Sequence, residues 1–243
     1  MLFKKNKNNA NRDFIVNDLY DNLTLKEAYV ILKDNIICYS IDNVKKVFQV
    51  ESAVQCEGKT TVAANLAVAL GESEKKVLIV DLDFRRPRTH RPFKLANVNG
   101  IAEYMIDKCS KEELVKHTNY KNVDVVNRGG EISNASVVLT SNKLKNLLNE
   151  FRDEYDFIIL DCPPVLMISD YIHIGKLSDG VLFVSAFALS KKKEVSEAVK
   201  QLKQNNINII GSVFTHYDPK KSQSNVEYSY RYYEYGQDYK QEN

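Results

Sequence analysis

Residues 51–61 read ESAVQCEGKTT, and this stretch decides the fold. It has an alanine, four residues and then Gly58-Lys59-Thr60, which is the alanine-first form of the loop that cradles phosphates. A mostly apolar run, 47–50, precedes the loop, and the helix-like run TTVAANLAVAL follows it. In such a strand–loop–helix unit, the amides and the dipole at the helix start attract a phosphate chain. The stretch therefore predicts a nucleotide-phosphate site.

The loop residues are expected to divide the work of binding the nucleotide. Lys59 would reach the outer phosphates, and the Thr60 hydroxyl would hold magnesium. The whole predicted nucleotide-binding set is Gln55, Cys56, Glu57, Gly58, Lys59, Thr60 and Thr61. A chance match in a glycine-containing turn is the alternative, and the residues downstream decide between the two.

Length and composition indicate a soluble globular protein. The chain has 243 residues, of which 44% are hydrophobic and 27% charged, so it can bury a sizeable core. A net charge of +2 gives no reason to expect a nucleic-acid partner. No apolar run approaches the roughly 20 residues of a membrane span, and the basic N-terminus lacks the apolar stretch of a signal peptide. We therefore expect a cytoplasmic protein.

The cysteines and histidines give no metal site. The cysteines lack paired ligand spacing and are interpreted as reduced thiols, and the four histidines are dispersed. The cysteines are Cys38, Cys56, Cys109 and Cys162.

Three segments are expected along the chain. Residues 1–22 form a basic, flexible N-terminal segment, 23–219 form the nucleotide-binding domain, and 220–243 form a disordered tail with almost no aliphatic residues. Within the domain, 23–36, 141–154 and 190–204 have helical spacing. Short apolar runs rich in β-branched residues are expected as strands: 77–83, 123–126, 156–161, 179–186 and 207–214.

The alternation of apolar strands with helices predicts an α/β fold. Its central sheet is mostly parallel, with helices on both faces, and ligands bind at the carboxyl ends of the strands. Asp81 and Asp83 end the run VLIVDLD, and Asp161 ends DFIILD before two prolines. A lone aspartate at such a place is often only a turn residue. Three of them beside a phosphate loop suit a site that holds magnesium and transfers a phosphoryl group.

These motifs together resemble those of the bacterial tyrosine kinases. VLIVDLDFRRP is similar to their Walker A′ motif, DFIILDCPPV to their Walker B motif, and KEAYVILKDNI to their N-terminal helix. The resemblance runs from about Leu25 to the terminus and is close to the free-standing kinases of capsule and exopolysaccharide synthesis, the CpsD/CapB type. It implies a P-loop NTPase architecture related to that of MinD- and ParA-like ATPases, with ATP and magnesium as cofactors.

The resemblance also assigns roles to individual residues. Lys59 and Asp81 would be catalytic, with Asp81 beside the tyrosine hydroxyl, accepting or orienting its proton. Asp83 and Asp161 would complete the catalytic set and, with Thr60, the magnesium site. Arg85 and Arg86 could steady phosphate or the acceptor, although a solvated loop explains them equally well. Positioning and charge neutralisation are most of what such a site must supply.

The tyrosine-rich end of the chain resembles the family's autophosphorylation cluster. Six of the 14 tyrosines lie there, and they are the predicted acceptors: Tyr228, Tyr230, Tyr232, Tyr233, Tyr235 and Tyr239. An aromatic interaction surface is the alternative for this segment. The resemblance further implies a transmembrane activator of the chain-length-regulator type, a cognate tyrosine phosphatase, a homo-oligomer, and attachment to the membrane through the partner.

Four places depart from the family pattern. Gln55-Cys56 replaces Pro-Gly in the loop, where a Cβ at position 56 narrows the range of φ. Val30 and Lys33 replace arginines of the assembly helix, where lysine lacks the planar fork of arginine. SNAS at 133–136 replaces Pro-Asn-Pro-Ser, and Thr215 stands where the family offers an asparagine to adenine.

Two other functions are compatible with these departures. One is a nucleotide-binding regulatory module of the same machinery with weak or no kinase activity. The other is a MinD- or ParA-like ATPase, against which the tyrosine tail and the absence of an early signature lysine at positions 53 and 54 both count.

Overall fold

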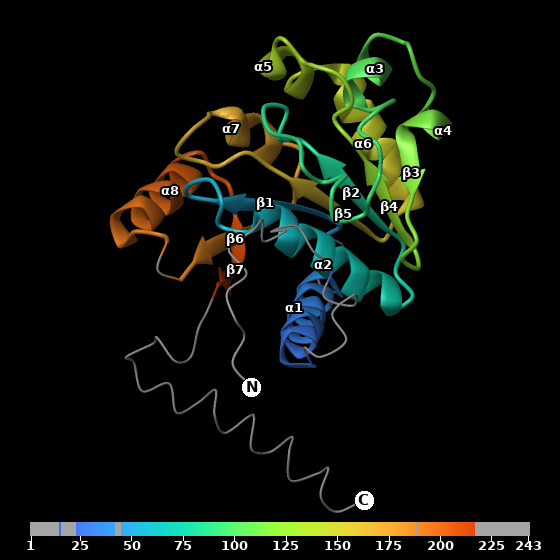
Figure 1. The fold of residues 1–243 in the computed structure, drawn as a ribbon. Coiled ribbons are helices and arrows are strands. Elements are labelled where there is room, and N and C mark those ends of the chain that lie inside the picture. Colours follow the sequence, from blue (N-terminus) through green and yellow to red (C-terminus); the bar gives the residue numbers. More distant parts are fainter. Residues whose placement is uncertain (1–14, 16–22, 42–44, 188, 217–243) are drawn as a thin grey trace, which may run out of the picture.

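The computed structural model describes residues 15, 23–41, 45–187 and 189–216, and within them seven strands form one sheet. Its strand order is β3-β4-β2-β5-β1-β6-β7, which places the strand that carries the phosphate loop, β1, near the centre (Figure 1). All neighbours are parallel except β3, which pairs antiparallel with β4 at one edge. The predicted α/β class with a mostly parallel sheet is therefore confirmed.

The strands are short and built from β-branched and aliphatic residues, which suit a sheet buried on both faces. Their bounds are β1 Val47–Ser52, β2 Val77–Asp81, β3 Val115–His117, β4 Val123–Val126, β5 Phe157–Asp161, β6 Gly180–Ala186 and β7 Ile209–Thr215. In β1, β2 and β5 every residue is buried.

Helices cover both faces of the sheet (Figure 1). One face packs against α2, on which α1 lies, and the other packs against α6, α7 and α8. The helices are α1 Leu23–Ile41, α2 Lys59–Glu72, α3 Ile101–Met105, α4 Lys111–Leu114, α5 Ala135–Leu139, α6 Asn142–Glu154, α7 Asp170–Gly175 and α8 Lys192–Gln204.

The predicted elements match the observed ones closely, with three differences. The helix expected over 23–36 runs five residues further, to Ile41. The strand expected over 77–83 ends at Asp81, because the Asp81 carboxylate accepts a hydrogen bond from the amide of Asp83 and turns the chain. Asp83 therefore lies two residues beyond the strand. The short elements β3, α3, α4, α5 and α7 were not expected, since three to six residues are too few to show a hydrophobic period.

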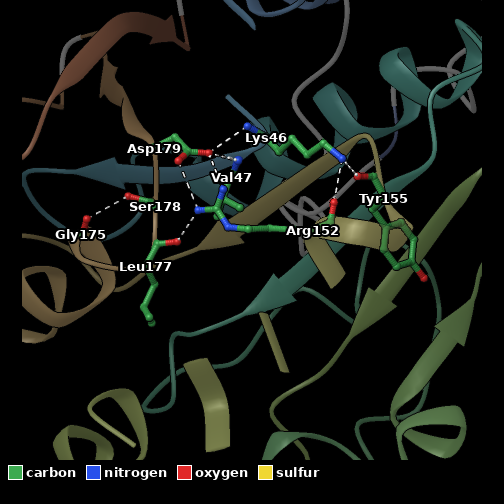
Figure 2. A network of polar contacts seen from close by, with 8 residues as sticks. All are labelled: Lys46, Val47, Arg152, Tyr155, Gly175, Leu177, Ser178 and Asp179. Atoms are coloured by element: carbon green, nitrogen blue, oxygen red, sulfur yellow. Dashed lines mark hydrogen bonds and ion pairs between the residues drawn. The ribbon is translucent and has the colours of Figure 1, made fainter. Parts of the chain in front are cut away.

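A polar network holds the amino ends of the central strands together (Figure 2). One Asp179 carboxylate oxygen accepts hydrogen bonds from the amides of Lys46 and Val47, at 2.9 and 2.8 Å, just where β1 begins. Arg152 of α6 donates to both oxygens of the same carboxylate, at 2.9 and 3.2 Å. The Lys46 ammonium in turn donates to the carbonyls of Arg152 and Tyr155. The network thus ties β1, the end of α6 and the start of β6 to one another.

No helix among the described residues is long and apolar enough to cross a bilayer. The expected N-terminal segment 1–22, apart from Ile15, and the tyrosine tail 220–243 lie outside the described residues.

Candidate functional site

The loop between β1 and α2 adopts a backbone that only particular residues tolerate. Gly58, the N-cap of α2, has φ of 95°, in the region that favours glycine. A Cβ at this position would stand 3.4 Å from the Thr215 methyl carbon, which is an ordinary van der Waals contact, so the positive φ is what favours glycine here. Cys56 has φ of 66°, which a side chain rarely adopts. The loop therefore curls tightly at the start of α2, as a phosphate cradle requires.

A pocket opens over this loop at the carboxyl edge of the sheet. Its walls come from the loop, from the segments after β2 and β5, and from the residue that follows β7. The lining residues are Gln55, Cys56, Gly58, Lys59, Thr60, Thr61, Asp83, Arg85, Arg86, Arg88, Pro164, Met167, Ile168 and His216. Six of the seven predicted nucleotide-binding residues thus line one pocket.

Lys59 and Thr60 line the pocket, and the Thr60 side chain links it to the buried Asp161. The Lys59 ammonium is buried and donates to the Ser52 hydroxyl at 3.1 Å. The Thr60 hydroxyl donates to Asp161 Oδ2 at 2.7 Å, and the Thr89 hydroxyl donates to the same oxygen at 3.0 Å. Burial raises the pKa of Asp161 to about 6, although the Thr60 hydrogen bond and the Lys59 charge act in the opposite direction.

Asp81 and Asp83 differ in their access to the pocket. Asp81 is fully buried, and its oxygens accept hydrogen bonds from the amides of Asp83, Arg88 and Thr89 at 3.2, 3.0 and 3.1 Å. Burial first, and then the charge of Asp161, raise the pKa of Asp81 well above its ordinary value. Asp83 lines the pocket. Asp81 therefore shapes the segment that presents Asp83.

The segment after β2 brings positive charge to the pocket. Arg85, Arg86 and Arg88 all line it, and the first two are exposed. Arg86 donates to the Gln55 side-chain oxygen at 2.6 Å, and its amide donates to Asp83 at 2.9 Å. This contact joins the phosphate loop to the segment after β2 across the pocket mouth.

Glu57 is the one predicted loop residue whose position differs from the expectation. It is fully buried, and its carboxylate accepts hydrogen bonds from the Val54 amide at 2.8 Å and from the Ser190 hydroxyl. The Thr215 hydroxyl donates to the Glu57 carbonyl at 2.7 Å. Glu57 thus connects the loop to Ser190, between β6 and α8, and to Thr215 at the end of β7. The Thr215 hydroxyl is therefore already engaged by the Glu57 carbonyl.

The other departures from the family pattern lie on α1 and at the start of α5. Val30 is 38% exposed on α1, and Lys33 forms an ion pair with the adjacent Asp34 at 2.9 Å. In SNAS, the Asn134 side chain accepts a hydrogen bond from the Val137 amide and caps α5. The six predicted acceptor tyrosines lie outside the described residues.

Several residues near the site gave no signal in the sequence. Thr89 and His216 carry no motif, and only the fold brings them beside the phosphate loop, whereas Ser52 directly precedes the loop in sequence. Gln49 and Glu51 of β1 are fully buried, and none of their side-chain oxygen and nitrogen atoms has a hydrogen-bond partner. Burial raises the pKa of Glu51 well above its ordinary value, while the nearby charge of Lys59 lowers it.

The pocket fits a magnesium-bound nucleotide. A glycine-dependent cradle at a helix start, a buried lysine and a row of arginines suit a chain of phosphates. The Thr60 hydroxyl and the Asp161 carboxylate offer adjacent oxygen atoms of the kind that magnesium prefers. No group of three or more His, Cys, Asp or Glu side chains among the described residues could hold a metal alone. Magnesium there would share its coordination with phosphate oxygens and water, as is usual in phosphoryl-transfer sites.

The fold and the site together define a P-loop NTPase, because the phosphate loop joins the central strand β1 to α2, and aspartates end β5, which is next to β1, and β2, which is next to β5. Comparison with known families agrees, since residues 46–210 match the AAA domain.

Comparison with individual proteins identifies the family. Tyrosine-protein kinase YwqD of Bacillus subtilis is 33% identical over 204 residues, covering 84% of this chain and 85% of that protein. Tyrosine-protein kinase Etk of Escherichia coli is 32% identical over 77% of this chain, which spans 26% of that longer protein. The solved kinase domain of E. coli Etk superposes with a TM-score of 0.74 at 30% identity, covering 82% of this chain and 80% of the domain. This chain belongs to the bacterial tyrosine-protein kinases, which transfer a phosphoryl group from ATP to protein tyrosine.

Proposed function

We propose that this kinase uses magnesium-ATP to phosphorylate the tyrosines of its own C-terminal segment, and that this modification regulates capsular or exopolysaccharide synthesis and export. The observation that carries the proposal is that Lys59, Thr60 and Asp83 line one pocket and that the Thr60 hydroxyl is hydrogen-bonded to the buried Asp161. The acceptors follow in the same chain, from Tyr228 to Tyr239.

In this proposal the loop and its lysine neutralise and orient the phosphates. Lys59 is already turned toward the loop by Ser52, so little reorganisation precedes binding. Thr60 and Asp161 would hold magnesium, which bridges the outer phosphates and neutralises their charge when bound. Arg85 and Arg86 line the same pocket and add positive charge where the transferred group becomes more negative.

Asp81, the last residue of β2, and Asp83, two residues beyond it, have different roles in this proposal. The full burial of Asp81 and its three amide contacts support a positioning role, and the place of Asp83 on the pocket wall supports contact with magnesium or the acceptor. In the transfer, the tyrosine oxygen loses its proton to a carboxylate and forms a bond to the γ-phosphorus. The bond from that phosphorus to the β–γ bridging oxygen breaks, and ADP leaves.

Phosphorylation would change the tail through its charge. Each phosphate adds about −1.5 to −2 charges. Several phosphates between Tyr228 and Tyr239 repel one another and would release the tail from a partner subunit's pocket. A relative from Klebsiella pneumoniae, 31% identical over 64% of this chain, is named as a tyrosine-protein kinase of the cps region, which supports the link to polysaccharide. The partners we propose are a transmembrane activator of the chain-length-regulator type, a cognate phosphatase and further copies of this chain.

Mass spectrometry of the tail after incubation with magnesium-ATP tests the proposal. We expect phosphotyrosine in the native protein, none with Lys59→Met, and a normal amount with Lys121→Met, a matched change of an exposed lysine that pairs with Glu74. Asp83→Asn should lower the rate more than 100-fold without loss of stability. Replacing the six tail tyrosines by phenylalanine should abolish labelling and keep ATP binding.

Two outcomes would favour another function. ATP binding without phosphotyrosine, even with the activator's cytoplasmic segment added, would indicate a regulatory nucleotide-binding module. Release of inorganic phosphate with an unmodified tail would indicate an ATPase of the MinD or ParA kind.

A further inference from the structure

The pocket is asymmetric across the sheet. β1 carries the phosphate loop and lies between β5 on one side and β6 with β7 on the other. The β2–β5 side supplies the charged and apolar walls: Asp83, Arg85, Arg86, Arg88, Pro164, Met167 and Ile168. Among the described residues, His216 is the lining residue that comes from the β6–β7 side.

This asymmetry orients the nucleotide. Thr60 is hydrogen-bonded to Asp161 at the end of β5, and Asp83 follows β2, so the magnesium and acceptor end lies on the β2–β5 side. The outermost phosphate must lie at that end, because the acceptor attacks it there. The nucleoside, at the other end of the phosphate chain, then extends toward β6 and β7.

The position of His216 is fixed by its neighbour. The Thr215 hydroxyl donates to the Glu57 carbonyl at 2.7 Å, and the Phe187 amide donates to the Thr215 carbonyl at 2.9 Å. The Thr215 methyl carbon is the nearest atom to a Cβ built on Gly58. His216 follows with φ of 55°, and its exposed side chain lines the pocket. The backbone at His216 is thereby fixed beside the phosphate loop, which places a flat imidazole at the pocket.

We propose that His216 is a specificity-determining residue that stacks on the base of the bound nucleotide, in place of a hydrogen bond from Thr215. This inference rests on the proposed function, since it takes the pocket to bind ATP. An aromatic face held at the rim can stack on a base without reading its edge, and a purine offers a larger face than a pyrimidine. Loss of one such stack typically weakens binding about tenfold.

Calorimetric titration with magnesium-ATP and with magnesium-tripolyphosphate tests this role, because tripolyphosphate has the phosphates and lacks the nucleoside. His216→Ala should weaken ATP binding about tenfold and leave tripolyphosphate binding unchanged. His216→Phe should retain ATP binding, since it keeps an aromatic face. The preference for ATP over UTP should fall in His216→Ala. His117→Ala, which alters a histidine on the edge strand β3, is the matched control and should bind both ligands normally.

Three results would overturn the inference. The first is that His216→Ala binds ATP as tightly as the native protein. The second is that this variant loses ATP and tripolyphosphate binding equally, because an equal loss would indicate damage to the phosphate loop. A selective loss of ATP binding in Met167→Ala, with none in His216→Ala, would place the base on the β5 side. A different result would reject the proposed kinase activity without bearing on His216: the native protein would bind ATP normally but form no phosphotyrosine.

Discussion

At the scale of single residues, the phosphate loop contains a side chain where its backbone favours none. Cys56 has φ of 66° and is exposed at the pocket. At a positive φ of this kind, the backbone of a residue that has a Cβ is strained by about 1 kcal/mol relative to glycine. The sequence predicted the difficulty from the missing Pro-Gly, and the structure locates it in one residue. Gln55, the other departure, has a partner in Arg86.

We therefore predict that Cys56→Gly stabilises the protein. The free energy of unfolding should rise by up to about 1 kcal/mol, because the φ strain disappears while the exposed thiol has little packing to lose. Urea denaturation measures this change. Cys38→Gly is the control with the opposite sign, since Cys38 lies within α1, where glycine is less favourable than cysteine by about 0.3 kcal/mol. A loss of stability in both variants would show that the loop backbone at Cys56 is not strained.

At the scale of elements, α2 holds the phosphate loop against the sheet through a close contact. Gly71, in the last turn of α2, faces the chain just before β4, where an added Cβ would stand 2.3 Å from the Lys121 carbonyl oxygen and 2.8 Å from a Val123 methyl carbon. Helix propensity favours alanine over glycine by about 1 kcal/mol, so propensity and packing make opposite predictions here.

We predict that packing wins and that Gly71→Ala is destabilising. A backbone oxygen cannot move away cheaply, so we expect a loss of about 2–3 kcal/mol in thermal or urea unfolding. Gly211→Ala in β7 is the matched control, because its Cβ would meet only a Leu182 methyl carbon at 3.9 Å. That variant should be neutral or slightly more stable. Equal stability of the two variants would contradict the packing argument.

The network around Asp179 lies at the amino ends of β1 and β6, opposite the end that carries the phosphate loop (Figure 2). Burial alone would raise the pKa of Asp179, but hydrogen bonds from Arg152 and from the amides of Lys46 and Val47 hold it below its ordinary value of 3.8. A lowered carboxyl pKa adds stability above the unfolded value, and this stability is lost as pH falls through the folded value. The network should therefore stabilise the sheet at neutral pH and fail below about pH 4.

Asp179→Ala should lower the free energy of unfolding by about 2 kcal/mol at pH 7, because two amides and Arg152 lose their partner. The difference from the native protein should shrink in urea titrations below pH 4. Asp107→Ala removes a carboxylate whose ion pair with Lys143 is exposed, and should cost less than about 0.5 kcal/mol. A comparable loss of unfolding free energy in both variants would show that the Asp179 network stabilises the protein no more than an exposed ion pair does.

At the scale of the whole molecule, the sequence predicted most of the fold because the central strands are apolar and helices such as α6 and α8 are amphipathic. It predicted that Lys59, Thr60 and Asp161 share a site, since the carboxyl ends of parallel strands meet at one edge. It could not separate buried Asp81 from Asp83, two residues away, because access depends on how the chain turns after β2. The contributions of Thr89 and His216 depend on long-range contacts that no local pattern encodes.

The gathering of carboxylates at one edge makes magnesium binding depend on pH. Burial raises the pKa of Asp161 to about 6, so in the metal-free protein its ionised form costs stability as pH rises through that value. Magnesium needs the ionised form. Between pH 5.5 and 7.5 the ionised fraction rises about fourfold, and the affinity for magnesium-ADP should rise by the same factor. Fluorescence titration at constant ionic strength measures this change.

Asp161→Asn is the control for this titration, because ADP also changes its protonation over the same range. The variant should bind magnesium-ADP more weakly at pH 7.5, and the pH dependence that remains in it belongs to the nucleotide. The part contributed by Asp161 is the difference between the two proteins, and it should vanish when magnesium is removed by a chelator. An identical pH dependence in both proteins would show that Asp161 is already ionised at pH 5.5, and that Thr60, Thr89 and Lys59 offset its burial fully.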